Sequence, residues 1–353
     1  MSYALVVLFT STSIASKATP NLPPLHDSAL DIVVELPFRP GNVSVTTSGR
    51  VFATIHPFAG ERGVQLIEIK PKGKYQPWPS NALQSPEGSY SAKTIDSPLG
   101  ITDDKQGGLW IVDMGNHLGY TRIWGFDIET GNVIAKINLP KEIVPATSFV
   151  QDLVVDRQRG WIYLADLANP SIISVELSTQ NVRRFSDHPG LQPEAGATMI
   201  INNEPVLFAG QPAHSGINPI TLSDDGETLF FGAMNGTSWY RLPTIGLRQQ
   251  SSDKAIKASV NKVGAKPISD GATTDKMGIH YFTNLNANGI DILSKNGRLT
   301  PLLRDPRLDW PDNVSVSADN WLYISVNQLH KSTPFSGSDK GQAPYFIYRY
   351  KLK

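Results

Sequence analysis

The chain of 353 residues contains no cysteine. This absence excludes disulfide bonds, catalysis by a thiol and metal sites built from thiolates. Neither sign of charge predominates, because 32 lysine and arginine residues balance 32 aspartate and glutamate residues. A chain without a net positive field does not attract polyanions, so we expect no nucleic acid partner. No apolar run is long enough for a transmembrane helix, and we expect no membrane span.

Several catalytic and metal-binding patterns are also missing. The seven histidines are scattered, and no pair has the His-x-x-x-His spacing of a helical zinc site. The Gly-x-Ser-x-Gly turn of serine hydrolases does not occur, and neither does the Gly-x-x-x-x-Gly-Lys loop that holds phosphates. The sequence therefore favours neither a serine hydrolase nor a nucleotide-binding enzyme.

The N-terminus predicts export. An apolar run at Tyr3–Phe9 is followed by small polar residues up to Ala18, which is typical of a signal peptide and too short to cross a bilayer. A disordered segment or an edge strand is the alternative interpretation. We expect residues 1–18 to be the signal peptide and residues 19–353 to form one domain of a secreted or periplasmic protein.

One phrase recurs six times along the chain. In each copy an alternating apolar strand reaches a tight turn and returns as a second strand, as in Asn218–Gly232. The turn residues that mark the copies are separated by 42 to 66 positions: Gly49, Gly108, Gly160, Gly226, Gly278 and Asn320. A four-stranded propeller blade needs ~40–50 residues. The repeat predicts an all-β, six-bladed β-propeller with four-stranded antiparallel blades around a central channel. Strands near Asp31–Leu36 and Tyr345–Tyr350 would close the ring within one blade.

Polar residues stand where the inner strands begin, and in a propeller these positions meet at one mouth of the channel. They are Asn42, Asp152, Asn218, Asp270, Asp312 and Asn313. Carboxylate and amide oxygens suit a divalent cation such as Ca²⁺ or Mg²⁺, or the polar groups of a small-molecule ligand. Phe149 and Trp310 precede two inner strands and could stack on an aromatic or cationic ligand. The alternative is structural, because aspartate and asparagine often cap turns and aromatic residues often pack between blades.

Several stretches of the chain are similar to the yellow/major royal jelly protein family, in a bacterial-looking form. They are Arg50–Pro57, Tyr75–Ser80, Ser97–Ile101, Gly108–Gly115, Ile162–Asp166, Val182–Arg184, Pro219–Asp224, Ser269–Gly271, Pro311–Asn313 and Ser325–Leu329. The resemblance implies a secreted six-bladed propeller that binds small molecules at one mouth of its channel. Some insect members resemble dopachrome-converting enzymes, and salivary members bind biogenic amines. The chain differs from the insect members in lacking cysteine and in being shorter.

A more distant likeness is to gluconolactonase-type propellers of the SMP-30 kind. The resemblance implies metal ligands at Asn218 and Asp270, whereas Asn42 stands where those enzymes supply a glutamate. The functions left open are therefore three. The chain binds a small polar or aromatic ligand at the channel mouth, or it is a metal-dependent lactonase or hydrolase, or it resembles a dopachrome-converting isomerase. No charge run or repeated surface motif supports a fourth class, a propeller that binds other proteins.

Overall fold

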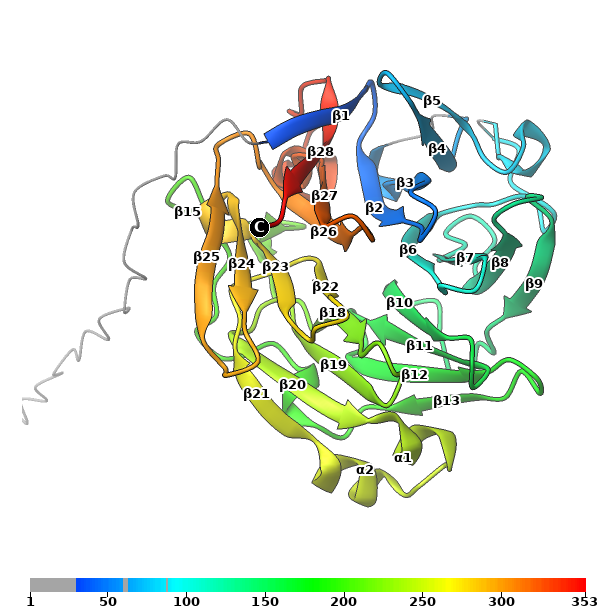
Figure 1. Cartoon of the computed structure of the whole chain (residues 1–353), viewed down its shortest axis with the longest axis vertical. Helices are drawn as coiled ribbons and strands as arrows, with labels where there is room; N and C mark the ends of the chain where they lie inside the picture. Colours follow the sequence, from blue (N-terminus) through cyan, green and yellow to red (C-terminus); the bar gives the residue numbers. More distant parts are fainter. Residues whose placement is uncertain (1–29, 60–62, 87) are drawn as a thin grey trace, which may run out of the picture.

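The computed structural model describes residues 30–59, 63–86 and 88–353, which form a six-bladed β-propeller (Figure 1). The fold class predicted from the repeat is confirmed, with four antiparallel strands in each blade. The expected signal peptide, residues 1–18, lies outside the described residues. Within those residues, no helix has the length and apolar character needed to span a membrane.

In blades 1 to 5 the four strands follow chain order from the channel outward. Blade 1 consists of β2 (Pro40–Val45), β3 (Val51–Ile55), β4 (Leu66–Lys70) and β5 (Lys74–Pro77). Blade 2 consists of β6 (Pro98–Asp103), β7 (Gly108–Asp113), β8 (Arg122–Asp127) and β9 (Val133–Asn138). Blade 3 consists of β10 (Val150–Asp156), β11 (Trp161–Asp166), β12 (Ser171–Glu176) and β13 (Val182–Phe185).

The second half of the ring follows the same order. Blade 4 consists of β18 (Ile217–Leu222), β19 (Thr228–Ala233), β20 (Ser238–Pro243) and β21 (Asn261–Ala265). The connection between β20 and β21 contains two helices, α1 (Thr244–Arg248) and α2 (Asp253–Ser259). Blade 5 consists of β22 (Ala272–Thr274), β23 (His280–Asn284), β24 (Gly289–Leu293) and β25 (Leu299–Arg304). Blade 6 consists of β26 (Pro311–Val316), β27 (Trp321–Val326), β28 (Tyr345–Lys351) and β1 (Leu30–Leu36).

Blade 6 closes the ring with strands from both ends of the described chain. Strand β1 pairs antiparallel with β28, and the register runs from Leu30 opposite Tyr350 to Leu36 opposite Tyr345. The closure predicted from the sequence is therefore confirmed. Strand β28 pairs with β27 on one side and with β1 on the other, so β1 is the outer strand of the blade.

The inner strands approach one another closely around the channel. A Cβ atom at Gly100 would lie 2.6 Å from the carbonyl oxygen of Gln151 in the next blade, and one at Gly271 would lie 2.4 Å from that of Asp312. Only glycine fits at such positions. Five inner strands also contain a register shift near their start, among them β10 between Val150 and Asp152. Such bulges redirect side chains, and they place polar residues at the channel.

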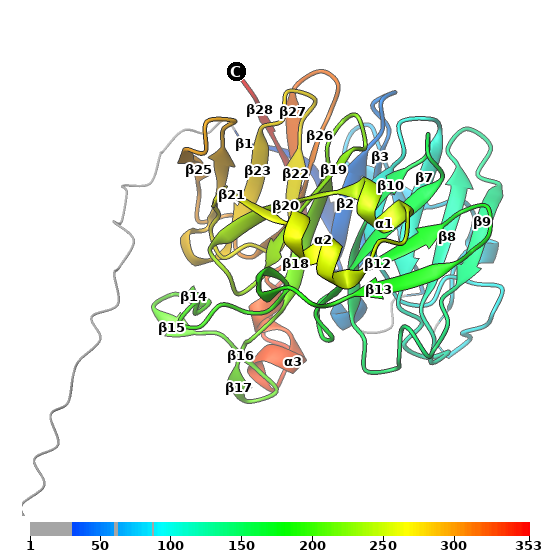
Figure 2. The same ribbon diagram turned by 90° about the horizontal axis from the view of Figure 1, so that it is seen from below.

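A cap covers one end of the propeller, and we use this name for residues 186–216 and 327–344. It contains the short hairpin strands β14 (Ile200–Ile201), β15 (Glu204–Pro205), β16 (Leu207–Phe208) and β17 (Gln211–Pro212), the 3-10 turns η3 (Pro189–Leu191) and η5 (Leu329–Lys331), and helix α3 (Thr333–Ser336). Figure 2 shows β14–β17 and α3 projecting together from one side of the blades. The amide of Ala209 donates to the carbonyl of Pro334 at 2.8 Å and joins the two parts of the cap.

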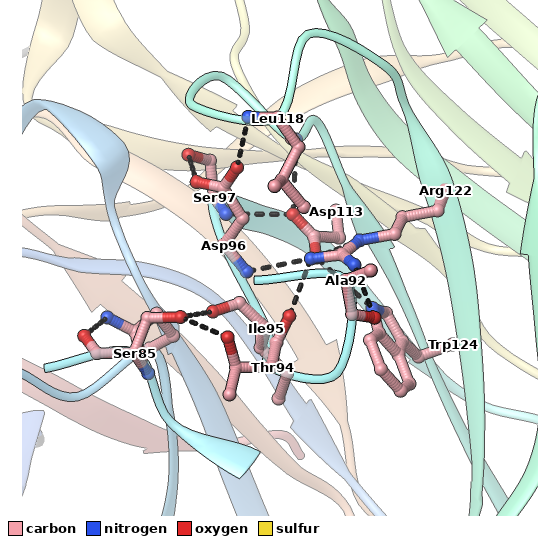
Figure 3. Close-up of polar contacts among 12 residues, drawn as sticks. Ser85, Ala92, Thr94, Ile95, Asp96, Ser97, Asp113, Leu118, Arg122 and Trp124 are labelled. Carbon is pink, nitrogen blue, oxygen red and sulfur yellow. Dashed lines mark hydrogen bonds and ion pairs between the residues drawn. The ribbon is translucent and has the colours of Figure 1, made fainter. Parts of the chain in front are cut away.

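A buried ion pair anchors the segment that enters blade 2 (Figure 3). The Asp113 carboxylate accepts hydrogen bonds from the backbone of Asp96 and Ser97 and from the Arg122 guanidinium, which lies 2.9 Å away. Arg122 also donates to the carbonyls of Ala92 and Thr94. Both charged side chains are 0% exposed. The Trp124 indole also donates to Asp113 at 3.1 Å. The pair therefore holds residues 92–97 against the blade, and its charges are satisfied within the protein.

We predict that Asp113→Ala destabilises the protein by about 3–5 kcal/mol, because the substitution leaves the Arg122 charge buried without its partner. The measurement is the free energy of unfolding in urea. Asp166→Ala is the matched control, since Asp166 pairs with Arg184 at the equivalent end of β11, but the Arg184 side chain is 21% exposed and can be hydrated. Equal losses in the two variants would contradict the prediction.

Candidate functional site

Three buried aspartates from three blades lie near one another in the channel. Asp152 is on β10, Asp312 is on β26, and Asp270 immediately precedes Gly271 and β22. Their exposed fractions are 6%, 2% and 1% for Asp152, Asp270 and Asp312. Each of the three carboxylates interacts electrostatically with at least one of the others. The repeat positions highlighted in the sequence therefore give one acidic cluster, here called the channel carboxylates.

Asp270 is held by hydrogen bonds from three other blades or linkers. Its Oδ1 accepts from Asn218 Nδ2 at 2.8 Å and from Gln151 Nε2 at 2.6 Å. Its Oδ2 accepts from the Trp310 indole nitrogen at 2.7 Å. Asn218 also donates to the Asp270 backbone carbonyl at 2.6 Å. This carboxylate therefore has a complete set of donors, and its position is fixed.

Asp312 is less completely satisfied. Its Oδ2 accepts from Asn327 Nδ2 at 2.6 Å, while Oδ1 is buried and has no hydrogen-bond partner. The side-chain oxygens of Asn42 and Asn327 are also buried without a donor. Asn327 Nδ2 donates to the carbonyl of Pro40 at 3.0 Å, which brings it beside the strand that carries Asn42. A buried acceptor without a donor costs free energy, so this side of the channel favours a bound group that carries N–H, O–H or positive charge.

Burial makes the channel carboxylates harder to ionise. It raises the pKa of Asp152 from 3.8 to about 7, and the neighbouring Asp270 charge adds to the effect. Burial likewise raises the pKa of Asp270 to about 7, against the hydrogen bonds from Trp310, Gln151 and Asn218. The pKa of Asp312 lies well above 3.8, because of burial first and of repulsion by Asp270 and Asp152 next. Protons and ligands therefore compete for the same oxygens near neutral pH.

The other residues predicted for the site have different surroundings. Asn313 Oδ1 accepts from the backbone of Val43 at 3.4 Å, so Asn313 links blades 6 and 1. Trp310 is 1% exposed; its ring packs against Phe335 and is stacked on His330. Phe149 is only partly buried and contacts Phe58 at a centroid distance of 6.0 Å. In this arrangement Trp310 contributes its N–H to Asp270 and presents no open ring face.

Sequence reasoning missed Asn327 and Lys266. A signal for Asn327 exists, because the residue that follows the second strand is apolar in four blades (Met114, Leu167, Met234 and Leu285) and polar in two, at His56 and Asn327. Lys266 gives no such signal. It is 2% exposed in the linker that leads to Asp270, and burial lowers its pKa to about 7 against the attraction of Glu194 and Asp270.

Asn218 and Asp270, the pair expected to bind a divalent cation, are hydrogen-bonded to each other. Asn218 turns its amide nitrogen toward Asp270, and both Asp270 oxygens already accept N–H donors. Within residues 30–59, 63–86 and 88–353, no group of three or more histidine, aspartate or glutamate side chains is placed to hold a metal ion. The residue types remain those that Ca²⁺ and Mg²⁺ prefer, but binding would require Asn218 to present its oxygen.

The raised pKa values predict that the channel carboxylates contribute less to the stability of the folded protein at pH 8 than at pH 5. Between the unfolded pKa near 4 and the folded pKa of about 7, the folded state binds more protons than the unfolded state, so the free energy of unfolding falls as pH rises. His56, His280 and Lys266 act in the opposite direction, because burial lowers their pKa values to about 3, about 4 and about 7. The contribution of the carboxylates is therefore measured by comparing variants.

Asp312→Asn should reduce the contribution of the carboxylates to this fall in the free energy of unfolding, because an amide at this position does not ionise. The measurement is urea unfolding of both proteins at pH 5 and pH 8. Asp319→Asn is the control, since Asp319 lies on an exposed turn where a hydrogen bond from Ser317 lowers its pKa. A pH dependence in Asp312→Asn equal to that of the wild type would contradict the assignment.

Solved structures with a similar fold include enzymes of several kinds. A gluconolactonase from Xanthomonas campestris is 13% identical, with a TM-score of 0.58, over 92% of this chain and 89% of the other. A luciferin-regenerating enzyme is 9% identical, with a TM-score of 0.56, over 92% and 95%. A streptogramin B lyase is 14% identical, with a TM-score of 0.54, over 92% and 97%. At these identities the likeness concerns the fold alone. No curated protein matches the chain.

A sequence model of one family, described as the major royal jelly protein, matches residues 97–333. The match includes blades 2 to 5 and the inner two strands of blade 6, and it therefore contains Asp152, Asn218, Asp270, Asp312 and Asn327. Together with the six-bladed propeller that the repeat predicted, this match shows that the chain belongs to the major royal jelly protein family.

Proposed function

We propose that this protein is secreted or periplasmic and binds a small polar or aromatic ligand in its central channel. The observation that carries the proposal is the group of buried acceptors without donors, Asp312 Oδ1, Asn42 Oδ1 and Asn327 Oδ1, beside the channel carboxylates. Export is supported by the apolar and small-residue pattern at residues 1–18. The resemblance to a family whose salivary members bind biogenic amines supports a small ligand.

The chemistry of the channel selects a donor-rich ligand. The three channel carboxylates repel one another, and a hydroxyl, ammonium or amidine group would satisfy oxygens that the protein leaves free. Asp152 accepts only from the backbone, from Leu153 at 2.9 Å and from Ile220 at 3.2 Å, so its remaining lone pairs can accept from a ligand. A positively charged group would bind most favourably, because it attracts the ionised carboxylates and lowers the pKa of each one beside it.

We predict that dopamine or tyramine binds at pH 7 with release of protons, since carboxylates with a pKa of about 7 become more ionised beside a cation. The measurement is isothermal titration in two buffers that differ in ionisation enthalpy. Asp152→Asn should weaken binding at least tenfold, a loss of about 1.4 kcal/mol. Asp319→Asn, on the exposed turn, should leave binding unchanged. If neither amine binds the wild type, a cationic aromatic ligand is ruled out, and polyols become the class to test.

A divalent-metal-dependent lactonase or hydrolase is the second candidate, with a dopachrome-conversion-like isomerase as a further alternative. One observation favours a cation, namely the mutual repulsion of the channel carboxylates, which a cation would relieve. The residues that would hold Ca²⁺ or Mg²⁺ are Asn218 and Asp270, after rotation of the Asn218 amide. When bound, such a cation polarises a carbonyl and activates water.

This second candidate predicts that Ca²⁺ or Mg²⁺ stabilises the purified protein after EDTA treatment. A cation at a hundredfold excess over its dissociation constant adds about 2.7 kcal/mol. The measurement is the thermal midpoint with and without each ion, together with metal analysis of the untreated protein. Asn218→Ala should abolish the shift, while Asp166→Asn, whose carboxylate lies outside the channel, should retain it. A midpoint that neither ion changes, in protein that contains no metal, would reject the metal-dependent enzyme.

A further inference from the structure

The channel has a cavity in its outer half, at the end of the propeller that carries the turns between the first and second strand of each blade. We call this end the turn face. A cavity of about 270 Å³ extends from these turns to Asp152 and Asn313. Hydroxyl side chains of inner strands line it, among them Ser44, Thr102 and Thr221. Asp152, the channel carboxylate that lines this cavity, is therefore reached from the turn face.

The opposite end of the channel is filled with apolar side chains. Met199, Met234, Leu285 and Trp310 form a buried cluster there, and the cap contributes to it. Phe335 on α3 packs against Trp310 at a centroid distance of 5.2 Å and against Phe208 on β16 at 5.1 Å. A polar molecule that entered from this side would have to displace the cap, so the turn face is the open route.

An ion pair crosses the opening at the turn face. Lys105, on the turn of blade 2, reaches Asp224 on the turn of blade 4, with 2.5 Å between Nζ and Oδ1, and both residues line the cavity. The pair links blades 2 and 4 without a residue of blade 3. Arg159, on the turn of blade 3, donates to the carbonyl of Asp225. Both side chains of the pair are more than half exposed. Exposed ion pairs contribute little to stability, and this contact can therefore open readily.

The backbone of Lys105 is held in an unusual conformation that directs the side chain. Its φ is 59°, a left-handed value that residues other than glycine rarely adopt. The carboxylate of Asp103 accepts from the Lys105 amide at 3.0 Å, and that of Asp104 accepts from the next amide at 2.8 Å. The two carboxylates therefore fix the turn that carries Lys105 at the rim of the cavity.

We propose that ligands enter the channel from the turn face and that the Lys105–Asp224 ion pair controls this entry. The inference rests on the proposed function and deepens it, since it names the route to Asp152 at the same site. Six carboxylates and two cationic side chains line the cavity: Asp103, Asp104, Asp152, Asp156, Asp224 and Asp225, against Lys105 and Arg157. Anionic molecules are therefore disfavoured, and removal of the Lys105 ammonium opens the route and increases this selectivity.

The absence of cysteine allows a direct test without any ligand. Ser44→Cys places a single thiol in the channel, and its labelling is followed by intact-protein mass spectrometry with a trimethylammonium methanethiosulfonate and with a sulfonate analogue of similar size. We expect the cationic reagent to react at least tenfold faster than the anionic one, after correction for their rates at Ser178→Cys on an exposed turn. Thr102→Cys is the second channel position if Ser44→Cys does not fold.

Two further variants test the direction of entry and the ion pair. Met234→Cys, in the apolar cluster below the cap, should react at least tenfold more slowly than Ser44→Cys. Adding Lys105→Met should increase the cationic labelling of Ser44→Cys three- to tenfold and leave Ser178→Cys unchanged. Faster labelling at Met234→Cys, or a rate at Ser44→Cys that Lys105→Met does not alter, would overturn the proposal. Because labelling needs no ligand, failure of amines to bind would affect only the proposed function.

Discussion

The pairing of β1 with β28 is the constraint on which the rest of this structure depends. It joins the two ends of the described chain in one blade, and so it fixes the ring at six blades. Once the ring is closed, the six inner strands have no freedom to move apart, and the side chains at their starts face one another. Asp152, Asp270 and Asp312 are far apart in sequence and belong to three blades, yet closure makes them neighbours.

That proximity has an electrostatic cost, which the surrounding residues only partly offset. Asp270 has three side-chain donors, whereas Asp312 has one and retains an oxygen without a partner. A protein selected for stability alone would gain by replacing such a cluster with apolar side chains. The retention of buried, incompletely satisfied acceptors therefore supports a ligand as the missing partner. It also explains why the same residues suit a cation or an organic donor.

The two ends of the channel differ for reasons that lie in the connections rather than in the blades. Long connections before blade 4 and within blade 6 form the cap (Figure 2), and its apolar side chains pack at that end of the channel. At the turn face the connections are short, and their polar residues leave the cavity open. The same strands therefore present a closed end and an open end to solvent, and this asymmetry defines how the carboxylates can be reached.

The sequence by itself determined the architecture and most of the site residues. Repeated hairpins with turn residues at similar spacing specify blades, because alternation and turn chemistry are local properties. Asn42, Asp152, Asn218, Asp270 and Asp312 could be selected because each stands at the start of an inner strand. Only the tertiary structure decided which of them interact, that Asn327 and Lys266 join them, and that Trp310 binds Asp270 through its N–H. These features depend on contacts between blades and on burial, and burial also raises the carboxylate pKa values. Both are set by residues far apart in the sequence, so they cannot be read from a short stretch of it.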